Sequence, residues 1–313
     1  MLSRVAENLY WLSRYVERAE NSARIVSVNA NLLLDLPKGI APGWQPLVEI
    51  IGGDVLFSQL YKEYDERSAV NFLVGDTRNP GSILSSLSLA RENARTIRDI
   101  FQREAWELIN ELYLYAKDNL NRGLSKRGRF AYLKHIIRGS QTLTGITSGT
   151  MNHNAGFHFS RLGALLERAE MTTRLIDARS ANLLPDEIAG QRSFENIQWR
   201  SILKSLNAYQ MYRQKMQVRV RRADALQFIL QDDEFPRAFY RCIIAVESRV
   251  KKLPKHDPVL RSLARTSRHV SKANIDTLTE SQEELHEFID ELQSGLAHVH
   301  EQIAEQYFLK PSS

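Results

Sequence analysis

The chain has 313 residues, of which 43% are hydrophobic and 25% charged, and its formal net charge is +5. This length is enough for one large domain or two ordinary ones with a sizeable hydrophobic core. The single cysteine, Cys242, excludes a disulfide framework and a thiolate metal site. The first residues lack the apolar stretch of a signal peptide, and no apolar run approaches the roughly 20 residues that cross a bilayer. We therefore expect a soluble, cytoplasmic protein.

The first segment has the clearest helical periodicity in the sequence. Apolar residues recur at alternating steps of three and four from Leu2 to Leu33, and no Gly or Pro interrupts them. This pattern predicts one long helix over about residues 3–34, with an apolar seam that must be buried against a partner. Pro37 and Gly39 then predict a loop.

Helical patterns separated by turn residues continue along the rest of the chain. In the first part we expect a helix over 44–64 with a break at Gly52-Gly53, a short helix through 74 capped by Asp65, and a turn over 75–81. Two helices should follow, one over about 82–101 and one that continues to 121, and then a basic loop over 123–128. Beyond it we expect helices over about 129–151 and 156–183, a stop at Pro185, and helices from 197 onward with turns near 232–236, 254–258 and 274–280. No segment alternates as a strand does. The fold class is therefore predicted to be all-α, a helical bundle.

Three groups of landmarks occur twice, in the same order. Glu17-Arg18-Ala19-Glu20 with Arg24 matches Glu167-Arg168-Ala169-Glu170 with Arg174. Next, Trp44 matches Trp199. Last, the set Phe72, Asp76 and Pro80 matches the set Phe228, Asp232 and Pro236. Such order favours an internal repeat. We predict two tandem copies of one unit of about 150 residues, a first helical repeat over 1–150 and a second over 151–313. Each copy opens on a long helix, and the two pack as a pseudo-symmetric pair in one compact body.

The repeated motif places acids and arginines on one stripe of each long helix. Residues advance by about 100° along a helix, so Glu17, Glu20 and Arg24 share a face. Two interpretations are open. Either the stripes form salt bridges across the pseudo-dyad, from Glu17 or Glu20 to Arg168 or Arg174, or they line a cleft that binds a charged group of a substrate or partner. The candidate binding residues are Glu17, Arg18, Glu20, Arg24, Glu167, Arg168, Glu170 and Arg174.

Other polar patterns are weaker candidates. A secondary polar helix face contains Arg91, Glu92, Asn93 and Arg95, and its alternative interpretation is a solvated, salt-bridged surface. The densest basic run, from Arg213 to Arg222, either faces solvent or contacts a phosphate backbone. A di-metal carboxylate bundle needs Glu-x-x-His on two helices. Only Glu283 and His286 have this spacing, so we predict no metal site.

The residues from Met1 to Glu20 resemble the opening of the bacterial alpha-E family, which is named for a predicted α-helical fold and a Glu-Arg motif. The segments 90–95, 167–169 and 235–237, together with Trp106, resemble that family too, so the resemblance covers essentially the whole chain. The second copy has the segment 157–162 in place of the Tyr10-Trp11 pair of the first. The two motif sites are therefore not expected to be equivalent.

The resemblance implies a function through the company that the family keeps. Members tend to be encoded beside, or fused to, a circularly permuted ATP-grasp protein, and often near a transglutaminase-like protein. ATP-grasp enzymes join a carboxylate to an amine through an acyl phosphate. We therefore expect an accessory partner of a peptide-forming or peptide-modifying amidoligase system that binds a charged group of an amino-acid or peptide substrate, or of the partner protein. No catalytic residues are identified, the chain is expected not to be an enzyme on its own, and no cofactor is predicted because ATP would belong to the partner.

Two alternatives of other classes stay open. One is a stand-alone enzyme that uses the paired glutamates as acid and base groups or as metal ligands. The other is a helical RNA-binding protein that recognises tRNA through its basic run. Nucleic acid is the less expected partner, and no membrane partner is expected.

Overall fold

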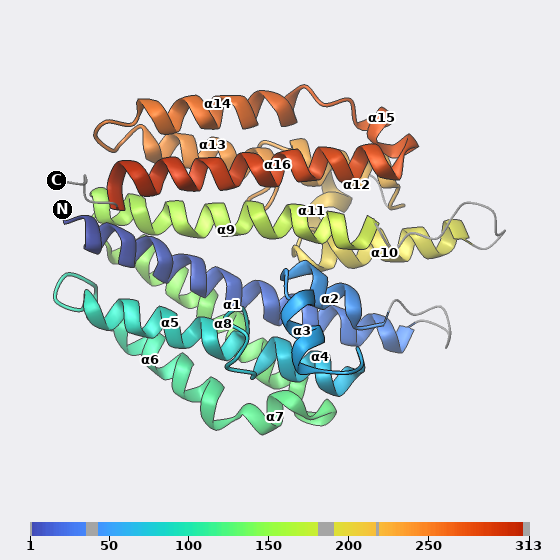
Figure 1. Ribbon diagram of the computed structural model, residues 1–313, viewed down its shortest axis with the longest axis horizontal. Coiled ribbons are helices and arrows are strands. Elements are labelled where there is room, and N and C mark those ends of the chain that lie inside the picture. Colours follow the sequence, from blue (N-terminus) through green and yellow to red (C-terminus); the bar gives the residue numbers. More distant parts are fainter. Residues whose placement is uncertain (1, 36–42, 181–190, 217–218, 309–313) are drawn as a thin grey trace.

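The described residues of the computed structural model, 2–35, 43–180, 191–216 and 219–308, contain helices and no strand (Figure 1). The predicted all-α fold is confirmed. Two long helices, α1 (Ser3–Asp35) and α9 (Ala155–Ser180), lie side by side through the middle of the molecule. They lie together because the apolar seam of α1 must be buried, and Leu9, Leu12 and Val16 along it are all buried.

The remaining helices surround this central pair. In the first half they are α2 (Gln45–Ile50), α3 (Asp54–Leu60), α4 (Glu66–Val74), α5 (Ile83–Thr96), α6 (Arg103–Asp118), α7 (Leu120–Leu124) and α8 (Lys126–Thr150). In the second half they are α10 (Gln191–Ser205), α11 (Tyr209–Lys215), α12 (Arg222–Gln231), α13 (Phe239–Val250), α14 (Asp257–Ser271), α15 (Ile275–Glu280) and α16 (Gln282–Ile303), followed by a π-helical turn, η1 (Ala304–Phe308).

The two halves have the same order and packing of their main helices. Helix α1 packs on α5 and α8, and α6 packs on both of these; in the same way, α9 packs on α13 and α16, and α14 packs on both. The landmark pairs Trp44 and Trp199, and Phe72 and Phe228, are buried in each half. This arrangement is what two copies of one unit would form. The duplication itself, and its boundary at residue 150, stay predictions.

Small residues let α1 and α9 approach closely. Ala19 and Ala23 on α1, and Ala169 on α9, are fully buried. Gly163 on α9 lies directly against the backbone of α1, because a Cβ atom added there would stand 2.0 Å from the carbonyl oxygen of Tyr10. The two long helices are thus in backbone contact at this point, which fixes how their side chains face one another.

Local turn chemistry explains where several helices begin and end. The predicted break at Gly52-Gly53 is confirmed, and Gly52 has a φ of +67°, a left-handed conformation that favours glycine. The predicted cap at Asp65 is confirmed as well, since its Oδ1 accepts a hydrogen bond of 2.6 Å from Ser68 N. The predicted end of the second long helix near residue 183, and Pro185, lie outside the described residues.

Two predicted loops are wrong. The basic segment 123–128 contains the end of α7 and the start of α8, because the Ser125 hydroxyl accepts a hydrogen bond from Gly128 N and caps α8. The segment 274–280 forms the short helix α15, because the Asn274 side chain accepts from Asp276 N and Thr277 N. In both places a capping side chain starts a helix where turn residues suggested a loop.

None of the described helices is both long enough and apolar enough to cross a bilayer.

Alanine at Gly163 is expected to destabilise the protein by about 1–3 kcal/mol, because the added methyl group overlaps the backbone of α1 at Tyr10. We expect this loss of stability even though alanine is more favourable than glycine inside a helix by about 1 kcal/mol. Urea unfolding followed by circular dichroism measures the change. Gly145→Ala in α8 is the matched control, since nothing lies within 4 Å of the added atom and a small stabilisation is expected there. Equal effects at both glycines would contradict the close contact.

Candidate functional site

The two Glu-Arg dipeptides exchange partners between α1 and α9. Glu17 accepts hydrogen bonds from Arg168 Nε at 3.0 Å and Nη2 at 2.8 Å. Glu167 accepts from Arg18 Nε at 2.5 Å and Nη2 at 3.0 Å. Both pairs are therefore two-pronged, the strongest geometry for an arginine and a carboxylate. Cross-pairing, one of the two interpretations left open by the sequence, is present in the structure.

A second pair of ion pairs lies one helical turn further along each long helix. Glu20 accepts from Arg24 Nε at 2.9 Å and Nη2 at 2.7 Å, and Glu170 accepts from Arg174 Nη2 at 2.5 Å. Both pairs have the acid four residues before the arginine, the favourable order on a helix. Each of the eight motif residues thus forms an ion pair with another of them.

Two further arginines, which come from different elements, join these ion pairs. Arg237, in the connection before α13, donates to Glu17 at 2.7 Å and to Glu20 at 3.0 Å. Arg14, on α1, donates to Glu167 at 2.7 Å and also contacts Glu170. We call Glu17, Glu20, Arg24, Arg168 and Arg237 the first cluster, and Glu167, Glu170, Arg14, Arg18 and Arg174 the second cluster.

Neither Arg14 nor Arg237 is among the sequence-predicted site residues. The helical spacing does place Arg14 close to the stripe of Glu17, Glu20 and Arg24, one turn before Arg18, although it was not predicted as a binding residue. Arg237 could not have been found from spacing, since it is 220 residues away from Glu17. Only the packing of α13 on α9 brings it to the network.

The central carboxylates are buried and stay ionised. Burial by itself raises the pKa of Glu17, but the guanidinium groups of Arg168 and Arg237 outweigh it and hold that pKa well below its usual range. Burial likewise raises the pKa of Glu167, and Arg14 and Arg18 lower it by more. Both acids are therefore charged at neutral pH, and loss of either would leave buried arginines without a partner.

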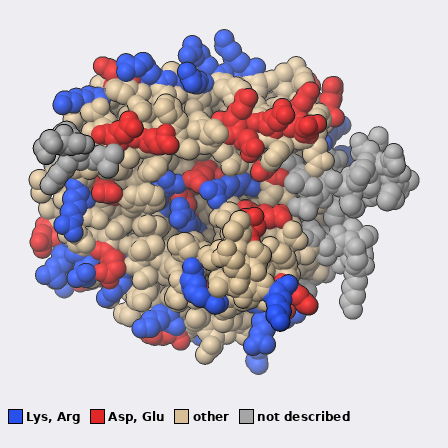
Figure 2. Space-filling view, viewed as in Figure 1, with Lys and Arg blue, Asp and Glu red and all other residues tan. Residues whose placement is uncertain are grey.

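The second cluster opens onto a cleft, whereas the first is nearly closed, since Glu17 and Glu20 line a pocket of only 30 Å³. The side chains of Arg18, Glu170 and Arg174 are 23%, 25% and 32% exposed, while none in the first cluster exceeds 12%. The cleft has a volume of 200 Å³. Its other walls are residues 51–53 and 56 around the α2–α3 connection, residues 79–81 before α5, and Met171. Figure 2 shows basic and acidic side chains around a hollow near the middle of the face in view.

The secondary candidates lie apart from this network. Arg91 on α5 donates to Asn110 of α6 at 2.7 Å and stacks over Tyr113. Glu92 pairs with Arg91 at 3.2 Å and with Arg95 at 2.8 Å, and both of these pairs are open to solvent. Asn93 is half-buried beside them. These residues form the salt-bridged helix surface that was the alternative interpretation; a binding role for them stays a prediction.

The basic run does not form one helix face. Helix α11 ends at Lys215 and α12 begins at Arg222, so Arg219 and Arg221 lie in the connection between them. Lys215 pairs with Asp232 at 2.7 Å and with Glu234 at 2.8 Å. Part of the positive charge of the basic run is thus neutralised within the protein.

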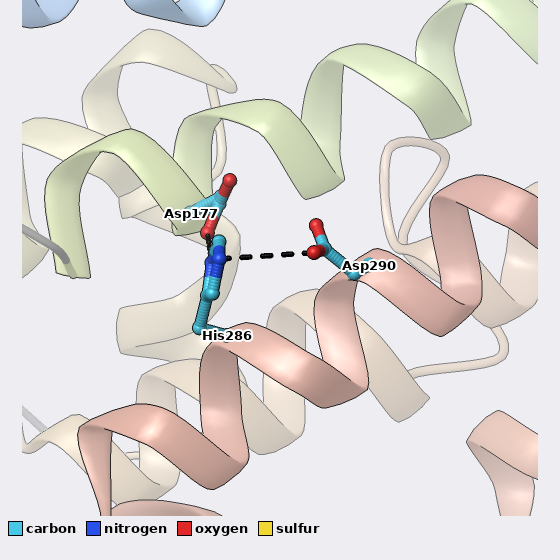
Figure 3. Close-up of side chains that lie close together, drawn as sticks. All are labelled: Asp177, His286 and Asp290. Carbon is cyan, nitrogen blue, oxygen red and sulfur yellow. Dashed lines mark hydrogen bonds and ion pairs between the residues drawn. The ribbon is translucent and has the colours of Figure 1, made fainter.

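His286 lies between two aspartates on the surface rather than beside Glu283. Its Nδ1 is 2.6 Å from Asp177 on α9, and its Nε2 is 3.7 Å from Asp290 on α16 (Figure 3). The hydrogen bond and charge of Asp177 raise the pKa of His286. One donor atom of each of these three residues lies within 4.8 Å of the other two, which is close enough for a metal ion, but each ring nitrogen of His286 already faces a different carboxylate. The arrangement fits a protonated histidine that links α9 and α16.

Glutamine at Glu17 is expected to destabilise the protein by about 3–5 kcal/mol, because Arg168 loses its buried counter-charge and Arg237 keeps only Glu20. Urea unfolding is the measurement. Addition of Arg168→Met should cost less than the sum of the two single changes, since the residues are coupled. Glu107→Gln is the control: its ion pair with Arg103 is exposed, so little change is expected. A Glu17 variant as stable as this control would mean that the network contributes no stability.

Acid should weaken the fold through the same carboxylates. The folded-state pKa values of Glu17 and Glu167 are lowered, so their contribution is complete above the unfolded pKa, about 4.3, and is lost as pH falls below it. The stability difference between wild type and Glu17→Gln should therefore be constant from pH 7 to about 5 and shrink between pH 4 and pH 3. A difference that does not change with pH would show that Glu17 is not ionised in the folded protein.

Known proteins provide an independent comparison. A family model described as a predicted alpha-helical domain with a conserved ER motif, called Alpha-E, matches residues 1–308. Uncharacterized proteins of Mycobacterium bovis and Mycobacterium tuberculosis are 24% identical over an alignment of 314 positions, which covers 94% of this chain and 34% of the relative. The chain thus spans about a third of the length of these curated relatives. No solved structure matches. Because the family model covers nearly the whole chain, the protein belongs to the alpha-E family.

Proposed function

We propose that this protein is an accessory helical partner of an ATP-grasp amidoligase system, which forms or modifies peptides. It binds a charged group of the amino-acid or peptide substrate, or of the partner, in the cleft beside Arg18, Glu170 and Arg174. A transglutaminase-like protein is a second expected partner. ATP belongs to the ATP-grasp protein, and the system is cytoplasmic.

The observation that carries this proposal is the unequal exposure of the two clusters. The first is closed by Arg237, while the second has charged groups of both signs at the edge of a cleft. The guanidinium of Arg18 is held in place by Glu167, so it loses little conformational freedom when a ligand binds. A fixed charged surface of this kind suits the positioning of a polar substrate.

The length of the curated relatives supports the proposal, because those longer proteins could carry a partner domain on the same polypeptide. About two thirds of each mycobacterial protein lies outside the match to this chain. This leaves room for further domains, as expected of a family whose members occur beside or fused to an ATP-grasp protein.

The alternatives fit the geometry less well. A general acid or base needs a pKa near the working pH. The pKa values of Glu17 and Glu167 lie well below it, and their oxygens accept hydrogen bonds from arginines that a metal ion would have to displace. An RNA-binding role would need a continuous basic surface, and the basic run is divided between α11 and α12.

The test is isolation of the tagged protein from the cells that naturally produce it, followed by mass spectrometry of the proteins and small molecules retained. An ATP-grasp protein should be recovered in a stoichiometric amount. Arg174→Gln should reduce amide formation by the complex without lowering its melting temperature, because this side chain is a third exposed and makes one ion pair. Arg103→Gln, on an exposed ion pair of α6, is the matched control. Recovery of the chain alone with a bound metal ion or metabolite would favour the stand-alone enzyme.

A further inference from the structure

We propose that the cleft beside the second cluster binds the carboxylate of a small molecule or of a peptide C-terminus, through the free N–H groups of Arg18 and Arg174. This inference deepens the proposed function and rests on its claim that the cleft binds a charged group. It specifies the sign of that group, the atoms that hold it and the size of what is attached to it.

The second cluster has more positive than negative charge. It contains three arginines and two glutamates. Each carboxylate oxygen already accepts from an arginine: Arg18 and Arg14 donate to the two oxygens of Glu167, and Arg174 and Arg14 donate to those of Glu170. The acids therefore need no cationic ligand, and one positive charge remains to be neutralised.

Unused hydrogen-bond donors of the cluster belong to the arginines at the cleft. Arg18 uses its Nε and Nη2, and Arg174 its Nη2, so Arg18 Nη1 and Arg174 Nε and Nη1 donate to no residue in the part of the chain that the structure describes. Both arginines line the cleft. Arginine presents its donors in a planar fork that matches a carboxylate, and such charge-assisted hydrogen bonds are among the stronger ones in proteins.

The comparison of the two halves explains why only the second cluster has this space. Arg237 stands two residues before α13, and Gly81 stands two residues before α5. In the first half of the network, the Arg237 side chain extends onto Glu17 and Glu20. In the second, Arg14 supplies the corresponding charge from α1, and Gly81 lines the cleft without a side chain. The cleft thus lies where the other half holds an arginine.

The dimensions and lining of the cleft define the rest of the ligand. A volume of 200 Å³ is below the roughly 300–1,000 Å³ of pockets for drug-sized molecules, so a group of about amino-acid size is expected. Ile51, Leu56 and Met171 form an apolar wall. A carboxylate with a short apolar side chain fits both features, whereas inorganic phosphate would use the charge and leave the apolar wall uncovered.

Methyl NMR of methionine can follow binding at this cleft. The chain has five methionines, of which Met171 lines the cleft and Met151 does not. N-acetyl-L-alanine, titrated into the full chain labelled with ¹³C at the methionine methyl groups, should shift the signal of Met171 and leave that of Met151 in place. N-acetyl-L-alanine amide, which differs only in lacking the carboxylate, should cause no shift. Met171→Leu assigns the signal.

Variants of the cleft then test the contacts. Arg174→Gln should weaken binding of N-acetyl-L-alanine about ten-fold or more, the usual effect of removing a hydrogen bond between charged groups. Gly81→Leu should weaken it by filling the cleft. A Cβ atom there meets only Asn79 Oδ1 at 3.2 Å and Ile51 at 3.9 Å, so the fold can accept it after a small shift. Arg103→Gln should bind as wild type does, and melting curves show that each variant is folded.

Three outcomes would overturn the inference. They are equal binding of the acid and its amide, undiminished binding by a folded Arg174→Gln variant, and binding of inorganic phosphate but not of N-acetyl-L-alanine. The proposed function is tested by a different result, so the two proposals can fail independently. Carboxylate binding without recovery of an ATP-grasp protein would leave this inference standing and remove the accessory role; recovery of that protein without carboxylate binding would do the reverse.

Discussion

Two ionised glutamates, Glu17 and Glu167, lie in the interior, and the arrangement of the central helices depends on the arginines that they require. A buried carboxylate without a partner would cost several kcal/mol. Each glutamate is instead held by the arginine that follows the other one. This reciprocal pairing is possible only when α1 and α9 lie side by side in one register. The apolar seams drive the two helices together, and the ion pairs select that register.

The same constraint gives a physical account of the Glu-Arg dipeptides at 17–18 and 167–168. Neighbouring residues on a helix point about 100° apart. Each dipeptide therefore presents an acceptor and a donor to the facing helix in a fixed order, and the two dipeptides satisfy each other. A change of one glutamate would affect both helices, since it leaves an arginine of the opposite helix without its counter-charge and removes one of the two carboxylates that hold Arg237 or Arg14.

A single difference between otherwise similar halves makes the site. Both clusters contain three arginines and two glutamates, but the last arginine comes from the loop before α13 in one and from α1 in the other. Where the loop supplies it, the cluster is closed. Where the loop has Gly81 instead, the fixed guanidinium groups face a cleft. The low pKa values of the central glutamates make them poor proton donors or acceptors at neutral pH, so this geometry suits holding a charged group more than transferring a proton.

The sequence by itself determined what depends on neighbours along the chain. The long first helix, the break at Gly52-Gly53 and the cap at Asp65 follow from periodicity and turn chemistry, and they were predicted correctly. So were the helical fold and the stripe of Glu17, Glu20 and Arg24. The predicted apolar seam is buried from Leu9 to Val26, whereas Leu2 at its start is exposed. Local signals were less reliable at Ser125 and Asn274, where one capping side chain outweighed the turn residues around it.

Only the tertiary structure decided how the stripes are used. Whether they form a buried network or an open cleft depends on what covers them, and the covering residues are distant in sequence: Arg237 is 220 residues from Glu17. The answer differs between the halves, with a closed network at Glu17 and a cleft at Glu170. Spacing within the motif could not distinguish them, because Glu-Arg-Ala-Glu-x-x-x-Arg is the same in both copies. The difference lies in residues outside the motif, such as Arg237 and Gly81.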